Sequence, residues 1–189
     1  MELHWVTVWA GPAQGPYPVG NPLLQPDLSF AFPAPEQGAA DQTFRLMVAP
    51  SLWGVRARIR LSNAFGPKPV TFSDAFIGVQ RESASLVGGS NRRLTFNGAR
   101  QVTVSPGDSI WSDGVDMDAR WPSVSMLSRR LAVSFCVRGA SGPMTWHAKA
   151  LTTSYVSRPG SGPCGELEDE AAFPYATSSW FFLDALDMA

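Results

Sequence analysis

The residues of this chain that could perform acid–base or nucleophilic chemistry are few and far apart. The sequence contains two histidines, His4 and His147. Hydrolysis of an ester or amide needs a nucleophile, a base and oxyanion donors, but no Gly-x-Ser-x-Gly elbow occurs. We also interpret the sequence as lacking the Gly-Asp-Ser nucleophile block of a second hydrolase class. On this basis we expect no catalytic residue in the chain.

His147, Ser62 and Asn63 are candidates for binding rather than for catalysis. His147 follows Trp146 in a β-prone run, and it is either hydrogen-bonded within a sheet or a functional group. Asn63 follows Ser62, and this pair either forms a turn or offers polar groups to a site. We expect Asn63 and His147 to reach toward a junction with a partner.

An arginine-rich strand is the clearest local pattern. Arg56, Arg58 and Arg60 alternate with apolar residues in the stretch VRARIRLSNAFG, and a period of two is what a half-buried strand requires. The polar face is either solvated and ion-paired or a docking surface for another domain, where Arg is favoured. Arg58 and Arg60 are the two that we expect at a domain junction.

Four carboxylates gather late in the chain, at Glu166, Glu168, Asp169 and Glu170. An acidic run in a loop is usually a solvated surface feature. A calcium site is the alternative, because oxygen ligands from loops suit that ion. No Cys and His spacing typical of a metal centre occurs, and we expect no metal and no cofactor.

The two cysteines lie in contrasting settings. Cys136 falls within a strand-like run and is typical of a small buried hydrophobic residue. Cys164 lies in the Gly/Pro-rich stretch GPCG. The compartment decides whether two such cysteines form a disulfide, and the sequence leaves that question open.

The composition is typical of short strands joined by turns. Charged residues make up 16% of the 189 residues, and Pro (16) and Gly (17) are plentiful. The net charge of −1 argues against nucleic acid or anionic lipid as a partner. No apolar run approaches about 20 residues, so we expect no membrane span. With no leader before the first strand, we expect a protein that is cytoplasmic by default, or secreted if a leader was removed.

Period-two alternation and turn residues predict strands along most of the chain. The predicted strands are 3–10, 42–49, 55–61, 70–72, 75–79, 94–96, 101–104, 109–112, 115–117, 131–137, 145–156 and 179–188. The turn at 51–54 predicts that the second and third of these form a hairpin-like pair. Pro/Gly-rich loops are expected at 11–40 and 158–178, and 119–130 is the one weak helix candidate. We therefore predict a single domain, 1–189, folded as an antiparallel β-sandwich of jelly-roll type with little or no helix.

Tryptophan is abundant, with seven residues in the chain. Trp9, Trp53, Trp111 and Trp121 lie near predicted turns. Exposed indoles stack on sugar rings, which would suit a carbohydrate site, and the alternative is that these residues anchor the core or an interface.

Several short motifs resemble, in the same order, the N-terminal region of bacterial SGNH (GDSL-type) hydrolases. The motifs are Trp5/Trp9, Gln42/Arg45, Pro50-Ser51-Leu52/Gly54, RIRLSNAFG at 58–66, Leu94-Thr95-Phe96/Gly98, Pro106-Gly107, Ser112-Asp113, Thr145-Trp146-His147 and Thr153-Ser154-Tyr155. The resemblance covers nearly the whole chain. It implies a β-rich accessory region, which in that family is followed by a flavodoxin-like catalytic domain.

The same resemblance implies that catalysis lies outside this chain. In that family the catalytic domain carries a Gly-Asp-Ser nucleophile, oxyanion Gly and Asn residues and a late Asp-x-x-His pair, and it hydrolyses esters through an acyl-enzyme. We carry no catalytic residue over and expect the isolated chain to be inactive. The expected partner is an SGNH catalytic domain, in cis or in trans, with this sandwich shaping one wall of the substrate entrance.

The residues expected at that junction or substrate wall are Asn63, His147, Arg58, Arg60 and Trp146. The rival hypothesis is a free-standing carbohydrate-binding module, whose ligand would be a carbohydrate or an acylated glycan. A third hypothesis is a purely structural interaction domain with a large exposed apolar patch.

Overall fold

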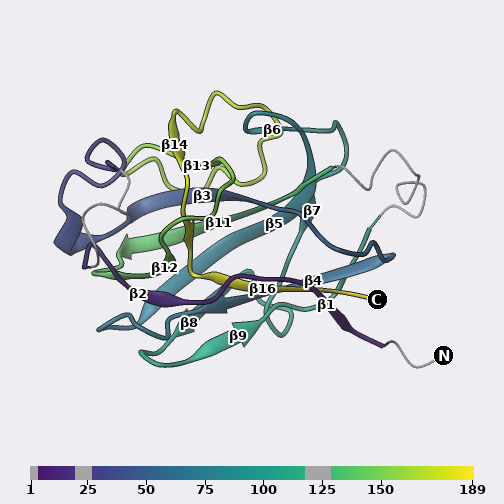
Figure 1. Cartoon of the computed structure of the whole chain (residues 1–189), viewed down its shortest axis with the longest axis horizontal. Helices are drawn as coiled ribbons and strands as arrows, with labels where there is room; N and C mark the ends of the chain where they lie inside the picture. Colours follow the sequence, from purple (N-terminus) through teal and green to yellow (C-terminus); the bar gives the residue numbers. More distant parts are fainter. Residues whose placement is uncertain (1–3, 20–26, 118–128) are drawn as a thin grey trace.

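The computed structural model describes residues 4–19, 27–117 and 129–189 (Figure 1). Over these residues the protein is all-β, and its strands pair in antiparallel sheets. Within the described ranges, the helical element is a 3-10 turn, η2 (Pro35–Gln37). The predicted all-β antiparallel sandwich is therefore confirmed. The weak helix candidate at 119–130 lies almost entirely outside the described residues.

One layer is a five-stranded sheet, here called the front sheet, in the order β1-β16-β4-β10, with β9 also pairing to β4. Its strands are β1 (Val6–Ala10), β4 (Arg56–Ser62), β9 (Ser109–Trp111), β10 (Val115–Asp116) and β16 (Leu183–Met188). In the central strand β4, Ala57, Ile59 and Leu61 are fully buried, and the arginines between them are half-buried. The alternation predicted for this strand is confirmed.

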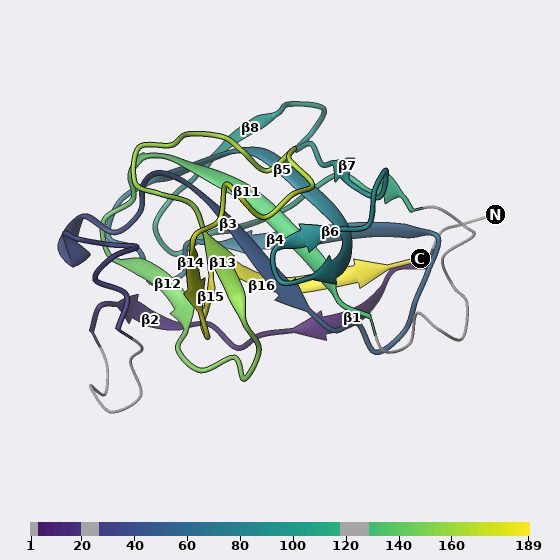
Figure 2. The same cartoon turned by 90° about the horizontal axis from the view of Figure 1, so that it is seen from above.

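The opposite layer is an eight-stranded back sheet, and a three-stranded side sheet closes one flank (Figure 2). The back sheet contains β3 (Ala40–Val48), β5 (Val70–Glu82), β6 (Ser85–Leu86), β7 (Arg92–Arg93), β8 (Gln101–Val104), β11 (Leu131–Ala140), β13 (Ser154–Val156) and β14 (Tyr175–Thr177). The side sheet contains β2 (Gln14–Tyr17), β12 (Met144–His147) and β15 (Trp180–Phe181). In Figure 1 the long strands β3, β5 and β11 lie above β1, β4 and β16.

Aromatic rings fill the centre of the core. Phe44 of β3 lies 5.5 Å from Phe135 of β11 and 5.3 Å from Phe181 of β15, measured between ring centroids. Phe72 of β5 lies 5.2 Å from Phe182, which joins the side sheet to the front sheet. All five rings are buried. Because burial of each large apolar side chain contributes about 1.5–3 kcal/mol, these contacts hold the layers together.

The structure overturns some of the predicted connections between strands. β3 pairs with β11 and β13, whereas β4 pairs with β16, β9 and β10, so the predicted hairpin-like pair does not form. The turn at 51–54 instead carries the chain from the back sheet to the front sheet. The predicted strand 145–156 splits into β12 and β13, and 179–188 splits at Phe182, whose φ is 59°. Local alternation does not specify which sheet a strand joins.

The segment predicted as a loop at 11–40 contains more regular structure than expected. β2 pairs with β12, and η2 precedes β3. Leu28 and Phe32 are buried in the core, whereas Phe30 is 78% exposed. Much of this segment is therefore part of the sandwich rather than a surface loop.

The second predicted loop, 158–178, is organised by one buried cation. Arg45 of β3 has no exposed surface, and each of its five N–H groups donates a hydrogen bond. The acceptors are Ser134 Oγ at 2.9 Å and the carbonyl oxygens of Ala84 at 2.8 Å, Asp169 at 3.3 Å, Gly165 at 3.2 Å and Leu167. Three of these carbonyls belong to the loop, which therefore lies against the outward side of the back sheet.

The guanidinium of Arg45 also has an aromatic neighbour, because its Cζ lies 4.0 Å from the ring centroid of Phe173. Burial lowers the pKa of Arg45 to about 10, and the nearby Cys164, Asp169 and Glu168 oppose that shift. The side chain therefore stays charged at neutral pH, and the loop backbone supplies most of its solvation.

Replacing Arg45 by Lys should loosen the loop, because an ammonium group has at most three donors. At least two buried acceptors would lose a partner, so we expect the free energy of unfolding to fall by about 2–4 kcal/mol. Urea unfolding followed by tryptophan fluorescence measures this change, and limited proteolysis should cut first within 158–178. Arg81→Lys is the control, because Arg81 is largely exposed and pairs with exposed Glu82 at 3.5 Å. Equal stability of both variants would contradict this account.

Candidate functional site

The outward side of the front sheet carries a row of alternating indole and guanidinium groups, which we call the Arg/Trp face. It consists of Trp5, Arg58, Trp111 and Arg60. The Cζ of Arg58 lies 4.6 Å from the ring centroid of Trp5 and 4.5 Å from that of Trp111. The Cζ of Arg60 lies 5.3 Å from the Trp111 ring. Each of these cation–π contacts contributes about 0.5–1 kcal/mol at exposed positions. Together they help to hold the four side chains in place.

Carboxylates of β16 neutralise this face. Nε and Nη2 of Arg58 donate to Asp187 Oδ2 at 3.0 and 2.8 Å, and Nε of Arg60 donates to Asp184 Oδ1 at 2.8 Å. The hydroxyl of Thr7 donates to the other oxygen of Asp187 at 2.8 Å. The face is thus ion-paired, and its Arg and Trp content is also that of many protein interfaces.

Asn63 lies just beyond the end of β4 and is fully buried. Its Nδ2 donates to the carbonyl oxygens of Lys68 at 2.9 Å and Val104 at 3.0 Å, and its backbone N–H donates to Asp108 O at 2.8 Å. A Cβ at Gly66 would lie 1.9 Å from Asn63 Oδ1, so this turn requires glycine there. The side chain of Asn63 therefore builds the turn and joins it to the segment between β8 and β9.

β12 places Trp146 and His147 in different surroundings. Trp146 is 3% exposed and stacks on Phe181 with ring centroids 5.9 Å apart. His147 is half-buried; its Nδ1 lies 3.0 Å from Pro12 O, and its ring lies 5.4 Å from that of Trp180. In the described part of the chain no carboxylate hydrogen-bonds to this imidazole, so no acid orients it as a base.

The structure brings some of the predicted site residues together. In the turn after Asn63, Phe65 N–H donates to Thr145 Oγ1 at 2.9 Å, which places this turn against β12 directly before Trp146. Arg58 and Arg60 instead point outward from the front sheet. The five predicted residues therefore belong to two separate regions.

One tripeptide corrects the interpretation that no Gly-Asp-Ser block occurs, because Gly107-Asp108-Ser109 has this sequence. It forms the turn between β8 and β9, where Gly107 has a φ of 85° and Asp108 O accepts from Asn63 N–H. Ser109 is exposed and pairs with Ser62 in the β-ladder. Among the described residues no hydrogen bond joins Ser109 to either histidine. Gly107 and Asp108 thus belong to a turn and Ser109 begins β9, without the base that an activated serine needs.

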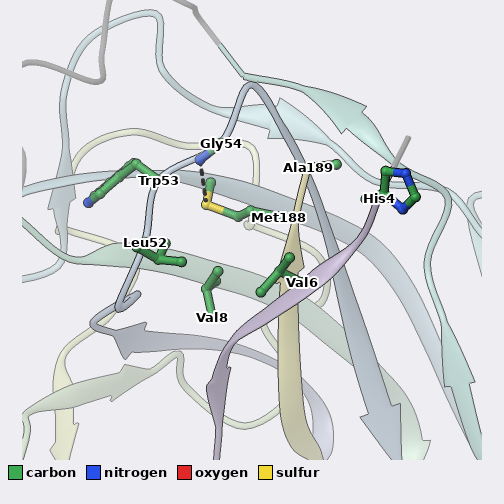
Figure 3. A pocket seen from close by; sticks show the side chains of 8 residues that line it. All are labelled: His4, Val6, Val8, Leu52, Trp53, Gly54, Met188 and Ala189. Carbon is green, nitrogen blue, oxygen red and sulfur yellow. Dashed lines mark hydrogen bonds between the residues drawn. The ribbon is translucent and has the colours of Figure 1, made fainter. Parts of the chain in front are cut away.

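Sequence reasoning missed an apolar hollow, here called the terminal hollow, where β1 and β16 meet the 51–54 turn. Its volume is about 190 Å³, and its lining residues are His4, Val6, Val8, Leu52, Trp53, Gly54, Met188 and Ala189. Figure 3 shows Val6 and Val8 on β1 facing Leu52 of the turn, with Met188 beside them. The hollow thus joins residues from the two ends of the chain and from its first third.

The rim of the terminal hollow is unusually apolar for a surface. Val6 is 49% exposed, Leu52 59% and the adjacent Val55 47%. Main-chain groups hold this rim in place, since Gly54 N–H donates to Met188 Sδ at 3.3 Å and Val55 N–H donates to Ala189 O at 2.8 Å. The rim is therefore a preformed apolar surface.

The indole of Trp53, at the edge of the terminal hollow, has an unmet hydrogen bond. Its Nε1 is buried and has no acceptor, although a buried indole N–H usually has one. The sequence signal that could have identified this place is the Leu52-Trp53 pair, two large apolar residues within a predicted turn.

The acidic cluster has structural roles. The Glu168 carboxylate accepts from Gly89 N–H at 3.0 Å and Asn91 N–H at 3.3 Å, and Glu166 lies 3.4 Å from Arg93. Within the described ranges, no group of three or more His, Cys, Asp or Glu side chains could hold a metal ion. The calcium alternative has no supporting geometry in that part of the chain.

Comparison with known proteins identifies no relative. No protein-family model matches this sequence, and no curated protein shows significant similarity to it. No helix in the described residues is long and apolar enough to cross a membrane. The structure therefore establishes the fold, and the family resemblance stays an expectation.

Truncating two of the predicted site residues should separate a structural role from a surface role. Asn63→Ala removes both side-chain hydrogen bonds from buried carbonyls and should lower the free energy of unfolding by about 2–3 kcal/mol. His147→Ala removes a half-buried ring and should lower it by less than about 1 kcal/mol. Chemical denaturation of the two variants beside the wild type measures the difference. A larger loss for His147→Ala would contradict these assignments.

Proposed function

We propose that this chain is a non-catalytic accessory domain of an SGNH-type ester hydrolase. The sandwich packs on the catalytic domain, in cis or in trans, and forms one wall of the substrate entrance. Two observations support the proposal: the ordered sequence motifs that resemble this family, and an apolar surface suited to a protein partner.

The terminal hollow is the observation that carries the proposal. Burying a fully exposed Val or Leu side chain contributes about 1.5–3 kcal/mol, and Val6, Leu52 and neighbouring Val55, which are about half exposed, could each gain roughly half of that. Ala189 lines the same hollow, so a catalytic domain joined in cis through this residue would begin beside it.

The other predicted junction residues fit around this contact in different ways. Val6 pairs with buried Met188 and faces inward, whereas Arg58 and Arg60 face outward, so a partner at the hollow would reach the Arg/Trp face only around the β1 edge of the front sheet. His147 is half-buried on the side sheet and stays a candidate for the substrate wall. Asn63 and Trp146 are buried, so they would act through the shape of the turn and of β12.

In the joined enzyme the chemistry belongs to the partner. Serine ester hydrolysis passes through an acyl-enzyme whose nucleophile and base lie in the catalytic domain. This chain would contribute position and shape, which matter because a substrate must be held close to the reacting group.

A free-standing carbohydrate-binding module is the alternative, and the tryptophan geometry weighs against it. Such a site needs indole faces open to solvent on one surface. Among the six tryptophans in the described residues, five are half-buried and Trp146 is buried. Trp111 has two guanidinium groups within 5.3 Å of its ring centroid. These contacts favour a protein partner.

A charge placed on the rim of the terminal hollow should abolish docking. The probe is the separately produced catalytic domain of an SGNH hydrolase of the family that the sequence resembles, titrated with this chain by calorimetry. Leu52→Asp should weaken binding at least about 30-fold, as loss of a central apolar anchor does. Leu151→Asp is the matched control, because Leu151 is 83% exposed and lies outside the hollow.

The two variants also define the results that would contradict the proposal. Wild-type chain that fails to bind the catalytic domain, while it retains a glycan on an affinity gel through its tryptophans, would favour the carbohydrate module. Equal weakening by Leu52→Asp and Leu151→Asp would place the interface elsewhere.

The isolated chain should not hydrolyse simple aryl esters such as 4-nitrophenyl acetate. Its described residues contain no serine with a hydrogen-bonded histidine, so Ser109→Ala and His147→Ala should leave the background rate unchanged. Turnover by the purified chain that disappears in either variant would overturn the accessory role.

A further inference from the structure

We propose that Cys136 and Cys164 form a disulfide that fixes the 158–178 loop to the outward side of the back sheet. Both thiols are free in the structure; Cys136 is buried and Cys164 is half-buried. This inference is independent of the proposed function. It rests on the position of the loop over β3 and β11.

Cys136 faces the loop rather than the core. On β11 the side chains of Val133, Phe135 and Val137 belong to the core cluster, so Ser134 and Cys136 lie on the outward side. The cross-strand neighbour of Cys136 on β3 is Thr43. Residues paired in this way have Cα atoms about 4.5–5.5 Å apart.

The loop is attached directly above these residues. Thr43 Oγ1 donates to Gly162 O at 2.8 Å and accepts from Cys164 N–H at 3.1 Å. On the other side of Cys164, a Cβ built on Gly165 would lie 3.2 Å from Ser134 Cβ. Gly162, Cys164 and Gly165 of the loop thus contact Thr43 and Ser134, two outward-facing neighbours of Cys136.

This arrangement limits the distance between the two cysteines. A disulfide requires Cα atoms about 4.4–6.8 Å apart, and Cys164 N lies 3.1 Å from Oγ1 of Thr43, the cross-strand neighbour of Cys136. A side-chain rotation and a small shift of the loop would bring the two sulfur atoms together. Gly162 and Gly165, which flank the Pro163-Cys164 pair, give the loop backbone freedom to shift.

Formation of the disulfide needs an oxidant that accepts two electrons. Oxidised glutathione, which is itself a disulfide, is the oxidant used in the test below. The Cys164 thiolate attacks one glutathione sulfur, forming a mixed disulfide and releasing the first glutathione thiolate. The Cys136 thiolate then attacks Cys164 Sγ, which closes the protein disulfide and releases the second. Two electrons pass from the cysteine sulfurs to glutathione, and the two thiol protons pass to its thiolates through solvent.

The order of attack follows from burial. Burial raises the pKa of the Cys136 thiol, and hydrogen bonds from Thr43, Arg138 and Ser73 oppose this shift. The thiolate is the nucleophile, so half-buried Cys164 meets the oxidant first and Cys136 resolves the mixed disulfide. The cross-link would then hold, covalently, a loop that Arg45 otherwise holds by hydrogen bonds.

The test oxidises the folded chain with glutathione disulfide, blocks the remaining thiols and maps the digested peptides by mass spectrometry. We expect one peptide pair that joins Cys136 to Cys164 in a monomer, and no free thiol. The oxidised chain should unfold at higher temperature and resist proteolysis within 158–178, and both changes should disappear on reduction. Cys164→Ser should show neither change.

A stable glutathione adduct on Cys164 with Cys136 still free would overturn the proposal. A dimer linked through Cys164 would do the same. Cys136→Ala fills the buried site with a smaller apolar residue and serves as a second variant should Cys136→Ser not fold. In Cys136→Ala, Cys164 should keep the glutathione adduct, because no second thiol is there to displace it. A disulfide that closes in the wild type and in neither variant would support the proposal.

Discussion

The buried guanidinium of Arg45 is the interaction on which the arrangement of the back sheet depends. Removing a positive charge from water is costly unless every donor finds an acceptor. Here the 158–178 loop folds back so that its carbonyl oxygens, with Ala84 O and Ser134 Oγ, accept all five N–H groups. Phe173 covers the cation, and the acidic residues nearby offset its charge. The part of the predicted 158–178 loop that precedes β14 is therefore a third layer over the sandwich, whereas residues 175–177 are a strand of the back sheet and not loop.

This extra layer makes the two faces of the molecule unlike. Residues 131–137 of β11 are all buried, because the core covers one side of the strand and the loop covers the other. The outward side of the front sheet carries the ion-paired Arg/Trp face instead. At one end, Val6, Leu52 and Val55 place three partly exposed apolar side chains close together at the terminal hollow. That cluster is the surface on which the proposed docking rests.

The predicted site residues show what the residue pattern within one stretch of the chain can and cannot predict. Arg58 and Arg60 were expected on one face, and strand alternation alone placed them there. Asn63 was interpreted as a turn residue or a site residue, and its hydrogen bonds to Lys68 O and Val104 O build the turn. The terminal hollow could not be predicted, because residues 4–8, 52–54 and 188–189 meet only when β1 pairs with β16 and the 51–54 turn closes over them. Gly107-Asp108-Ser109 is likewise distinguished from a nucleophile block by the structure, which places it where a turn enters β9.

By itself the sequence determined the all-β class, most strand positions and the side of β4 on which the arginines lie, because residues two apart in a strand share a face. Only the tertiary structure decided that β3 and β4 belong to different sheets, that 145–156 divides between two of them, and that the acidic loop folds onto Arg45. Those outcomes depend on which distant segments bury each other's apolar side chains and satisfy each other's hydrogen bonds. The free energy of those contacts depends on residues far apart in the sequence. No periodic pattern within a single stretch therefore predicts them.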